Sequence, residues 1–588
     1  MLLSAARRQV VTAPSRTLAT KTRVLISGGG PAGLVTALAL GRAGTPCVLV
    51  EPQSAPSAHP RAHVLTARTV EICEDLGLGD ALKEIAPPLE RWRQFRYCDR
   101  VDGADYAIAD HGAAPAWANL VAASDQRVQH ISQPVFEALL RRAVADTDVE
   151  TRYGRRIVDV GLDEGVRCAL DDGATVDAEY LVAADGPRGA AAKLVLDAAG
   201  GNAADRVPGI SHHLDAPALQ HFVSVAFRSK ALAARLRARP AMLYFVFNQD
   251  TASVVVAHDL DEGLFNLQFP VFPPAERPGD AAAPRNVRRE LRALTAAPLI
   301  DLKIESARPW LMRARLADRF AAENRAFLVG DAAHEMPPSG GFGMNTAVGD
   351  AHNLAWKLAL SCTGAVDSNE LLASYESERR PAAAANVALS IDNWHRGLLI
   401  PEALGLLPQA LDLVKVAAPT SAVFKTVTAA ARAAILARCA APHASMTAVV
   451  DQHCELPLFF PHHDLGLRYD GASARAAAAD AVDHARPGSR LYEPRLAAGE
   501  RLPAACALGP LDAGKYALAL IGASDQLAAA AAAAAADDRL AGVLDVRPAG
   551  GPGPALALVR PDRYVAAVWT DVEVDALRRD LLRLAYCA

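Results

Sequence analysis

The chain has 588 residues, more than one hydrophobic core usually organises, so we expect two or three domains. Apolar residues make up 51% of the chain, charged residues 22%, and the formal net charge is -5. This composition is typical of a globular protein and lacks the basic excess that nucleic acid binding requires, so no nucleic-acid partner is expected.

Cysteine usage and hydropathy exclude two further classes. The nine cysteines are scattered, odd in number and without a CxxC pair, which favours reduced thiols over a disulfide framework or a metal site. No stretch approaches the roughly 20 apolar residues that span a bilayer, so stable membrane insertion is not expected.

Residues 1–22 differ in composition from the rest of the chain. They contain Arg7, Arg8, Arg16 and Lys21, several Ser and Thr, and no acidic residue. This pattern is typical of a mitochondrial targeting peptide; the alternative is a disordered basic tail on a cytoplasmic protein. In either case we expect the segment to lie outside the fold.

The first motif follows at once, in "TRVLISGGGPAGL". An apolar strand, a glycine turn, a helical apolar pattern and a second strand "CVLVE" occur in order, and the acid Glu51 lies about twenty residues after the glycines. Gly28 permits the turn, Gly30 lets a pyrophosphate approach the backbone, and Gly33 lets helix and strand pack closely. Pro31 and Ala32 start a helix whose free N–H groups attract phosphate, and Glu51 would bind a ribose. The pattern predicts dinucleotide binding; the alternative is a glycine-rich loop without a ligand.

A second motif lies in "AFLVGDAAHEMPPSGGFGMNTAVGDAHNLAWKLAL", residues 326–360. A strand delivers Asp331, a carboxylate suited to ribityl hydroxyls; the alternative, a helix N-cap, does not account for the Pro-Pro and glycine turn beside it. Pro338, Gly341 and Gly343 shape a turn before a helix. The segment Gly343-Met344-Asn345 starts that helix, so its N–H groups and dipole could stabilise negative charge on a flavin.

These motifs resemble those of the class A flavoprotein aromatic hydroxylases, the family of p-hydroxybenzoate hydroxylase and phenol hydroxylase. The other stretches that carry the resemblance are "PRAHVLTARTVEICEDLGL" (60–78), "ISQPVFEALLRRA" (131–143), "YLVAADGPRG" (180–189) and "SYESERRP" (374–381). Together they cover about residues 23–400 in the family's order.

The resemblance implies an α/β fold with a Rossmann-like FAD-binding domain and an inserted β-sheet substrate domain. We expect the FAD-binding domain at 23–190 and 316–400, and the substrate domain at 191–315. Residues 401–455 are expected to form a helical connector or a homodimer surface, and 456–588 a thioredoxin-like domain. That last domain lacks CxxC, so we expect it to be structural.

The resemblance also assigns roles to single residues. Arg61 and Gln133 would contact the FAD phosphates or ribityl chain, and Asp185 would close over the flavin and the nicotinamide donor. Taken alone, these would be a surface arginine, a solvated helix residue and a turn residue. Two positions depart from the family, Gly189 where serine is usual and Ala192 where arginine is usual, which makes handling of NAD(P)H less secure than FAD binding.

The family's chemistry uses FAD, NADPH or NADH, and O2, and hydroxylates an electron-rich ring through a flavin C4a-hydroperoxide. His63, in "RAHVL", falls where phenol hydroxylase relatives carry a polar active-site residue, and an imidazole can accept a phenol proton. The alternative is a structural histidine. The pocket for a small aromatic substrate is expected from the strands of 208–315, with Tyr244, Phe247 and Phe265 as lining, although sheet aromatics are more often core.

In the C-terminal third, "YALALIG", a helix with nine consecutive alanines (528–536) and "LALVRPDRYVAAVW" predict strand, helix and terminal hairpin. The alternative for the alanines is a low-complexity insert. Three functions compete: a phenol-type hydroxylase as the leading hypothesis, a mitochondrial ubiquinone-ring hydroxylase, and an FAD-binding scaffold without turnover.

Overall fold

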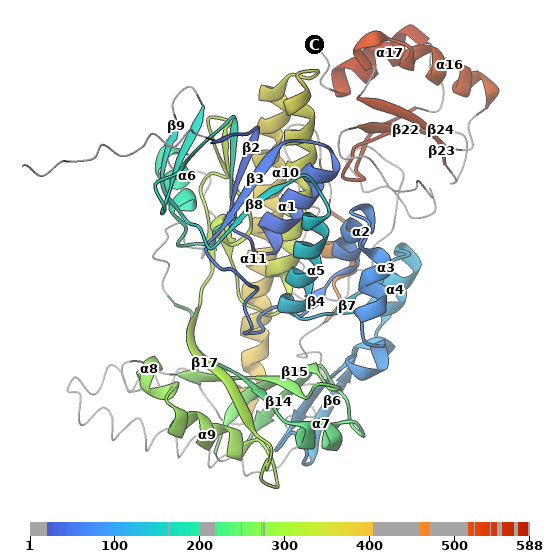
Figure 1. Cartoon of the computed structure of the whole chain (residues 1–588). Coiled ribbons are helices and arrows are strands. Elements are labelled where there is room, and N and C mark those ends of the chain that lie inside the picture. Colours follow the sequence, from blue (N-terminus) through green and yellow to red (C-terminus); the bar gives the residue numbers. More distant parts are fainter. Residues whose placement is uncertain are drawn as a thin grey trace, which may run out of the picture.

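The structure is a computed structural model (Figure 1). It describes residues 20–403 apart from 163–164, 200–217, 249, 272 and 274–276. It also describes 458–469 without 468, residue 508, and 515–585 apart from 522–523, 541–542, 550–554 and 570–573. Residues 1–19, most of the expected connector and the segment 470–507 therefore lie outside the described part of the chain.

A mostly parallel sheet of six strands forms the centre of the first domain, in the order β19-β20-β12-β2-β3-β8. Every residue of β2 and β3 is buried, which is why these segments read as continuous apolar runs. Since β2, β12 and β20 are parallel neighbours, their carboxyl ends meet at one edge of the sheet. The strands are β2 (Val24–Ser27), β3 (Cys47–Glu51), β8 (Glu150–Tyr153), β12 (Tyr180–Ala183), β19 (Ala321–Ala322) and β20 (Ala326–Leu328).

Helices α1 and α10 pack against each other and against this sheet through a shared core. Helix α5 packs on α1, and α2 and the long α11 pack on α10, whereas α3 follows α2, α4 lies near α3, and α6 packs against β9 and the edge of the sheet (Figure 1). The bounds are α1 (Pro31–Arg42), α2 (Ala67–Asp75), α3 (Gly79–Ile85), α4 (Pro115–Ala123), α5 (Gln133–Ala145), α6 (Ala190–Ala199), α10 (Phe342–Thr363) and α11 (Ser368–Ala403), with short 3-10 turns at Leu89–Arg91, His111–Ala113 and Gly330–Ala332.

The second sheet has seven strands in the order β17-β13-β16-β15-β14-β5-β6. One of its faces is covered by α7 and α9, whose Leu232, Leu236, Val287 and Leu291 share a core with the strands. The elements are β5 (Gln94–Cys98), β6 (Asp105–Asp110), β13 (Gln220–Arg228), α7 (Lys230–Leu236), β14 (Leu243–Phe247), β15 (Ala252–Asp259), β16 (Leu264–Val271), α8 (Pro278–Ala281), α9 (Pro284–Ala293) and β17 (Lys303–Met312).

Two expected boundaries differ from this arrangement. β5 and β6 belong to the seven-stranded sheet although they precede residue 191, because β5 pairs with β14 in parallel register. The chain therefore enters the second domain twice. Residues Thr20–Lys21 form β1 and pair with β11, so the end of the expected targeting segment is part of the fold. This small sheet, β1-β11-β10-β9, contains β9 (Ile157–Leu162), β10 (Val166–Leu170) and β11 (Thr175–Ala178).

Short strand pairs join the domains: β4 (Val64–Leu65) with β7 (Gln129–His130), and β18 (Arg315–Leu316) with β21 (His334–Glu335). Helix α11 continues past the expected end of the domain at residue 400, to Ala403. Within the described ranges, no helix is long and apolar enough to cross a membrane.

The C-terminal region contains a four-stranded sheet in the order β23-β22-β24-β25. β22 and β23 are parallel and joined through α16, whereas β24 and β25 form an antiparallel hairpin before α17. The alanine run is helical, and Ser524 caps it by accepting a hydrogen bond from Leu527 N–H. The elements are α15 (Pro461–Leu465), β22 (Tyr516–Ile521), α16 (Asp525–Ala535), a 3-10 turn (Asp538–Leu540), β23 (Leu544–Ala549), β24 (Ala555–Val559), β25 (Val565–Trp569) and α17 (Val574–Leu584).

Candidate active site

The glycine turn after β2 is as tight as a backbone allows. Gly28 has a φ of +106°, and a Cβ there would lie 2.3 Å from the carbonyl oxygen of Ala184. A Cβ on Gly33 would lie 1.9 Å from the carbonyl oxygen of Gly28. At Gly30, in contrast, an added Cβ would meet no atom within 4 Å. The turn is thus closed on its inner side and open at Gly30.

The N-terminus of α1 is free to bind an anion. Gly30 is the N-cap, Pro31 begins the helix, Ala32 is buried, and neither a side-chain cap nor a first-turn acid satisfies the N–H groups. Glu51 lies beside this turn, where its Oε2 accepts a hydrogen bond from Gly29 N–H (2.6 Å) and its Oε1 one from Gln53 N–H (2.7 Å). A carboxylate has about four acceptor sites, so capacity for ribose hydroxyls is left.

The second motif meets the first at Gly330. Its φ is +63°, and a Cβ there would lie 3.3 Å from Ala32 Cβ and 2.9 Å from Ala347 Cβ, so it fits between the first turn of α1 and the second turn of α10. The next residue, Asp331, is exposed, and its carboxylate has no hydrogen-bond partner among the described residues. The structure therefore brings Asp331 to the N-terminus of α1.

Buried charges hold the turn at Asp331 in place. Arg315, which is fully buried, donates to the carbonyl oxygens of Asp331 (2.7 Å) and Ala332 (2.8 Å). Asp350 accepts hydrogen bonds from His334 Nε2 (2.7 Å), Arg379 Nε (2.8 Å) and Gly330 N–H (3.3 Å). Burial opposes ionisation of Asp350, but Arg379 and His334 hold the pKa of that carboxyl below its ordinary value. The turn is rigid before any ligand binds.

The N-terminus of α10 is the second uncapped helix start in the site. Gly340 and Gly341 have positive φ values of 107° and 69°, Pro338 before them is exposed, and no side chain caps the helix. A Cβ added at Gly343 would meet only Met336 Cγ, at 3.9 Å.

The two residues that follow serve the fold. Met344 packs in the core, and Asn345 Nδ2 donates to Val64 O (2.9 Å). Asn345 Oδ1 also accepts from Thr66 N–H (2.9 Å), so this side chain clamps α10 to the loop that carries His63.

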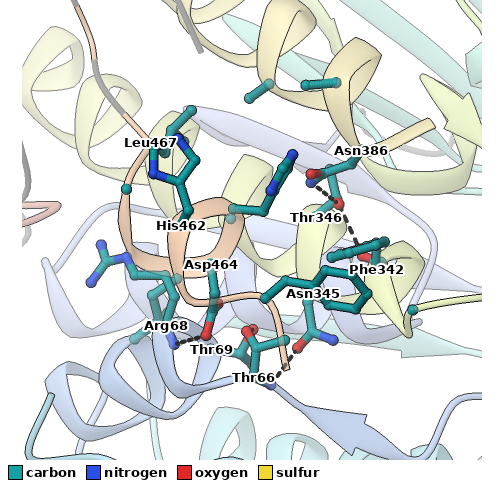
Figure 2. Close-up of a pocket in the computed structure, with 18 of the residues that line it drawn as sticks. Thr66, Arg68, Thr69, Phe342, Asn345, Thr346, Asn386, His462, Asp464 and Leu467 are labelled. Atoms are coloured by element: carbon teal, nitrogen blue, oxygen red, sulfur yellow. Dashed lines mark hydrogen bonds between the residues drawn. The ribbon is translucent and has the colours of Figure 1, made fainter. Parts of the chain in front are cut away.

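A cavity lies on another face of α10 (Figure 2). Its lining includes Phe342 and Thr346 of α10, Arg68 of α2, Asp464 of α15 and Leu467 in the segment after α15. The cavity volume is about 90 Å³, whereas ligand clefts usually measure roughly 300–1,000 Å³. We therefore do not assign the cofactor or the substrate to it.

The loop before β4 is tied to the seven-stranded sheet. His59 hydrogen-bonds Ser306 Oγ through Nδ1 (2.6 Å) and Ser224 Oγ through Nε2 (2.9 Å). His63 then contacts His130 and His258, at ring-centroid distances of 5.1 and 5.2 Å. Sequence analysis did not single out His59, His130 or His258. The only signal for His258 was a polar residue ending the apolar strand "ASVVVAHDL".

The three residues assigned through the "arginine", "glutamine" and "Asp-Gly" stretches have different surroundings. Arg61 is exposed. Gln133 donates through its backbone to Ala62 O (2.8 Å) and through Nε2 to Glu137 (2.7 Å).

The carboxylate of Asp185 is directed inward, which differs from the expected closure over the flavin. It accepts hydrogen bonds from Ser27 Oγ (3.1 Å) and from the N–H groups of Ala191 (3.0 Å) and Ala192 (3.2 Å) at the start of α6. A Cβ at Gly189 would lie 1.9 Å from Asp185 Cγ, so the departure from the family's serine leaves room for this carboxylate.

Two of the three aromatic residues expected to line the pocket do not do so. Tyr244 and Phe265 lie in the core beneath α7 and α9, on the opposite face of the sheet from the residues that contact the first domain. Strand alternation explains this, because Tyr244 and Val246 share one face while Leu243, Phe245 and Phe247 share the other. Phe247 packs with Trp92 and Phe95 in the cluster that also contains Val64.

The donor set fits FAD. It combines two uncapped helix N-termini, a carboxylate at the end of β3, an exposed carboxylate at Asp331 and an open backbone at Gly30. The N-terminus of α1 and the open backbone at Gly30 would hold the pyrophosphate, and the N-terminus of α10 the carbonyl edge of the flavin. Glu51 would bind the ribose and Asp331 the ribityl chain.

Comparison with known proteins agrees with this geometry. The family model described as "FAD binding domain" matches residues 21–390. The chain is 32% identical over 386 residues to the 4-methyl-5-nitrocatechol 5-monooxygenase of Burkholderia sp, a match that covers 64% of this chain and 67% of that protein. It is 30% identical over 379 residues to the 2,4-dichlorophenol 6-monooxygenase of Delftia acidovorans, covering 62% and 61%. Among solved structures, the flavin-dependent monooxygenase PieE in complex with FAD and substrate aligns with a TM-score of 0.74 and 28% identity, over 96% of this chain and 99% of that one.

Proposed function

The chain belongs to the FAD-binding family that contains the class A aromatic hydroxylases, and we propose that it hydroxylates a phenol-like ring that binds beside His63, where the first domain faces the seven-stranded sheet. It is an FAD-dependent monooxygenase with NAD(P)H as co-substrate. When bound, FAD takes a hydride from NAD(P)H and activates O2, so that one oxygen atom enters the ring.

One observation carries this proposal: Gly330 lies between the first turn of α1 and the second turn of α10, and Asn345 ties the backbone next to His63 to the first turn of α10. The two helix dipoles favour negative charge on the cofactor. The hydrogen bonds of His59 fix the His63 loop against the sheet, so a ring bound there would be oriented by groups that are already in place.

His63 is suited to accept a hydrogen bond from the phenol hydroxyl. Its Nδ1 is buried and has no hydrogen-bond partner among the described residues. Burial lowers the pKa of His63 to about 4, so the ring is neutral at neutral pH and one nitrogen is an acceptor. A phenol whose O–H donates a hydrogen bond to a neutral ring nitrogen becomes more electron-rich, which favours attack on oxygen.

NADPH consumption tests the function directly. Purified, FAD-loaded protein should oxidise NADPH faster in the presence of phenols and should release a product heavier by one oxygen atom. His63→Phe should lower product formation by about tenfold, the loss expected when one hydrogen bond to the reacting hydroxyl is removed. His111→Phe, a buried histidine outside the site, is the matched control and should retain activity.

The two alternatives have distinct results in that assay. A bound flavin that neither NADH nor NADPH reduces would indicate a scaffold without turnover. Activity on a ubiquinone-type ring but on no simple phenol would indicate the ubiquinone-ring hydroxylase. The named relatives support neither alternative.

Three finer assignments belong to the same proposal. The βαβ unit followed by a hairpin and a helix supports a thioredoxin-like C-terminal domain. The homodimer expected from the sequence is also a prediction, and the molar mass measured by light scattering tests it. The mitochondrial location expected from residues 1–22 is a prediction without support from the bacterial relatives, and a reporter fused to that segment tests it.

A further inference from the structure

Three histidines from separate segments meet where the first domain faces the seven-stranded sheet. His63 precedes β4, His130 lies on β7 opposite Val64, and His258 lies on β15. The ring of His63 is nearly perpendicular to the other two, at 82° and 90°, and the centroids of His130 and His258 are 6.4 Å apart. We call these three residues the histidine cluster.

The cluster contains buried polar atoms that the protein does not satisfy. His63 Nδ1, His130 Nε2 and both ring nitrogens of His258 have no hydrogen-bond partner among the described residues. His130 is 4% exposed and His258 7% exposed. Because a buried polar atom without a partner destabilises the fold, four such atoms in one place indicate a role outside folding.

The protonation state of the three imidazoles restricts the class of ligand that the histidine cluster can bind. Burial lowers the pKa of His63 to about 4 and those of His130 and His258 well below the ordinary value, so all three rings are neutral. A neutral imidazole offers one donor and one acceptor. Within the described ranges, no group of three His, Cys, Asp or Glu residues is arranged to hold a metal ion. The cluster is therefore suited to uncharged polar groups that both donate and accept.

The position of the cluster connects it to the substrate. The carbonyl oxygen of Val64, next to His63, accepts the hydrogen bond from Asn345 in the first turn of α10. The cluster thus lies between the proposed flavin site and the sheet, where the proposed function places the aromatic ring.

We propose that the histidine cluster binds two neighbouring oxygen substituents of the aromatic substrate, and so selects catechol-like or hydroxy-carbonyl rings over rings with a single hydroxyl. This inference rests on the proposed function. A single hydroxyl has one hydrogen to donate and two acceptor sites, so it forms at most three hydrogen bonds. The four unsatisfied nitrogens require a second oxygen close to the first.

Binding without turnover tests the inference. In the absence of NAD(P)H, phenol, catechol and 2-methoxyphenol are titrated into FAD-loaded protein, and the Kd of each is taken from the change in flavin absorbance. The wild type should bind catechol at least fivefold more tightly than phenol, the gain of one further hydrogen bond. 2-Methoxyphenol, which has the second oxygen but lacks its hydrogen, should fall between the two.

Substitution within the cluster should remove this preference. His258→Phe should bring the Kd values of catechol and phenol within twofold of each other, whereas His258→Gln, which keeps a donor and an acceptor, should restore most of the difference. His111→Phe is the matched control, because His111 is also buried and also has an unpartnered Nε2, but it packs on Phe95 outside the cluster. Retained FAD and an unchanged circular dichroism spectrum show that each variant is folded.

The outcomes separate this inference from the proposed function. Equal catechol preference in wild type and His258→Phe, or no preference in the wild type, overturns the inference. If phenols still stimulate NADPH oxidation in that case, the hydroxylase assignment stands. If no aromatic compound changes the flavin spectrum and none stimulates NADPH oxidation, both fall.

Discussion

Gly30 and Gly33 both lack a Cβ, but the structural reason for glycine differs between the two positions. At Gly33 the limit comes from the protein, because a Cβ would overlap the carbonyl oxygen of Gly28. At Gly30 the protein leaves space, and φ is -78°, an angle that any residue adopts. The motif therefore combines one glycine needed for folding with one needed for the ligand.

We predict that Gly33→Ala lowers the free energy of unfolding of the flavin-free protein by at least about 2 kcal/mol, since the overlap is with backbone. Gly30→Ala should leave that stability unchanged and weaken FAD binding by about tenfold. Urea unfolding and a fluorescence titration with FAD measure the two effects. Equal effects of both substitutions on stability would contradict this division of roles.

The histidine cluster makes the fold sensitive to acid. Burial holds the pKa of His258 well below its ordinary value of about 6.5, so as the pH falls below 6.5 the unfolded chain binds a proton at this residue that the folded chain does not. The unfolded state then binds more protons, so stability rises with pH and falls as pH drops below 6.5. His63, His130 and His59, which face His258, would add positive charge if protonated and strengthen the effect.

Between pH 7 and pH 5.5, the wild type should therefore lose about 1 kcal/mol more stability than His258→Phe. Urea unfolding at the two pH values measures this difference. His395→Gln, at an exposed position on α11, serves as the control and should follow the wild type. A variant that loses as much stability as the wild type would show that His258 protonates freely in the folded state.

Individual site residues could be predicted from the sequence where their role depends only on neighbouring residues in the chain. Gly28, Gly33 and Glu51 followed from a turn, a close packing contact and a spacing within one βαβ unit. His130 and His258 could not be found in this way, because their meeting with His63 depends on how two sheets pack. Tyr244 and Phe265 were assigned by residue type alone, whereas strand alternation decides their face, and the covering helices were not foreseen.

Among the elements, α10 and α11 carry the main connection to the C-terminal domain. Arg560 donates to both carboxylate oxygens of Glu378 on α11, at 2.6 and 2.7 Å, and to Asp562. Lys357 on α10 also binds Glu378 (2.9 Å). Burial opposes ionisation of Glu378, but Arg560 and Lys357 lower the pKa of that carboxyl to about 2. The stability from this pair is present above the unfolded pKa of about 4.3 and is lost as pH falls towards 2.

We predict that Arg560→Met destabilises the protein by about 3–5 kcal/mol, because it leaves Glu378 buried with one cation fewer. Arg539→Met is the matched control, since Arg539 is 55% exposed and pairs with Asp537 in the same domain. It should cost no more than about 1 kcal/mol. Thermal unfolding compares the two variants, and similar losses would mean that the Glu378 network contributes only as a surface pair does.

Element types were easier to predict than element membership. The long apolar and helical patterns of β2, α1, β20 and α10 identified those elements, and the alanine run proved helical because Ser524 caps it. Membership of β5 and β6 in the second sheet was missed because it depends on pairing with β14, about 150 residues further along the chain. No local pattern reports such a partner.

At the scale of the whole molecule, the C-terminal sheet packs against the first domain and is not a separate unit. Trp356 and Leu360 of α10 share a hydrophobic core with Tyr516, Leu518 and Leu558 of that sheet. The C-terminal segment also reaches α2, where the guanidinium of Arg563 binds the carboxylate of Asp75 (2.7 Å), which is 4% exposed. The first contact begins on α10, which starts at the candidate cofactor site, and the second on α2, although the family model ends at residue 390.

Removing residues 515–588 would therefore expose the apolar face of α10 and leave Glu378 and Asp75 buried without their arginines. We predict that the shortened chain aggregates and fails to retain FAD, since the helix whose first turn faces the flavin loses support along its length. Soluble yield and flavin absorbance after purification measure this. Arg563→Ala alone weakens the same contact by only one ion pair and should give a soluble, yellow protein with a lower Tm. A shortened chain that stays soluble and yellow would show that α10 is held by the first domain alone.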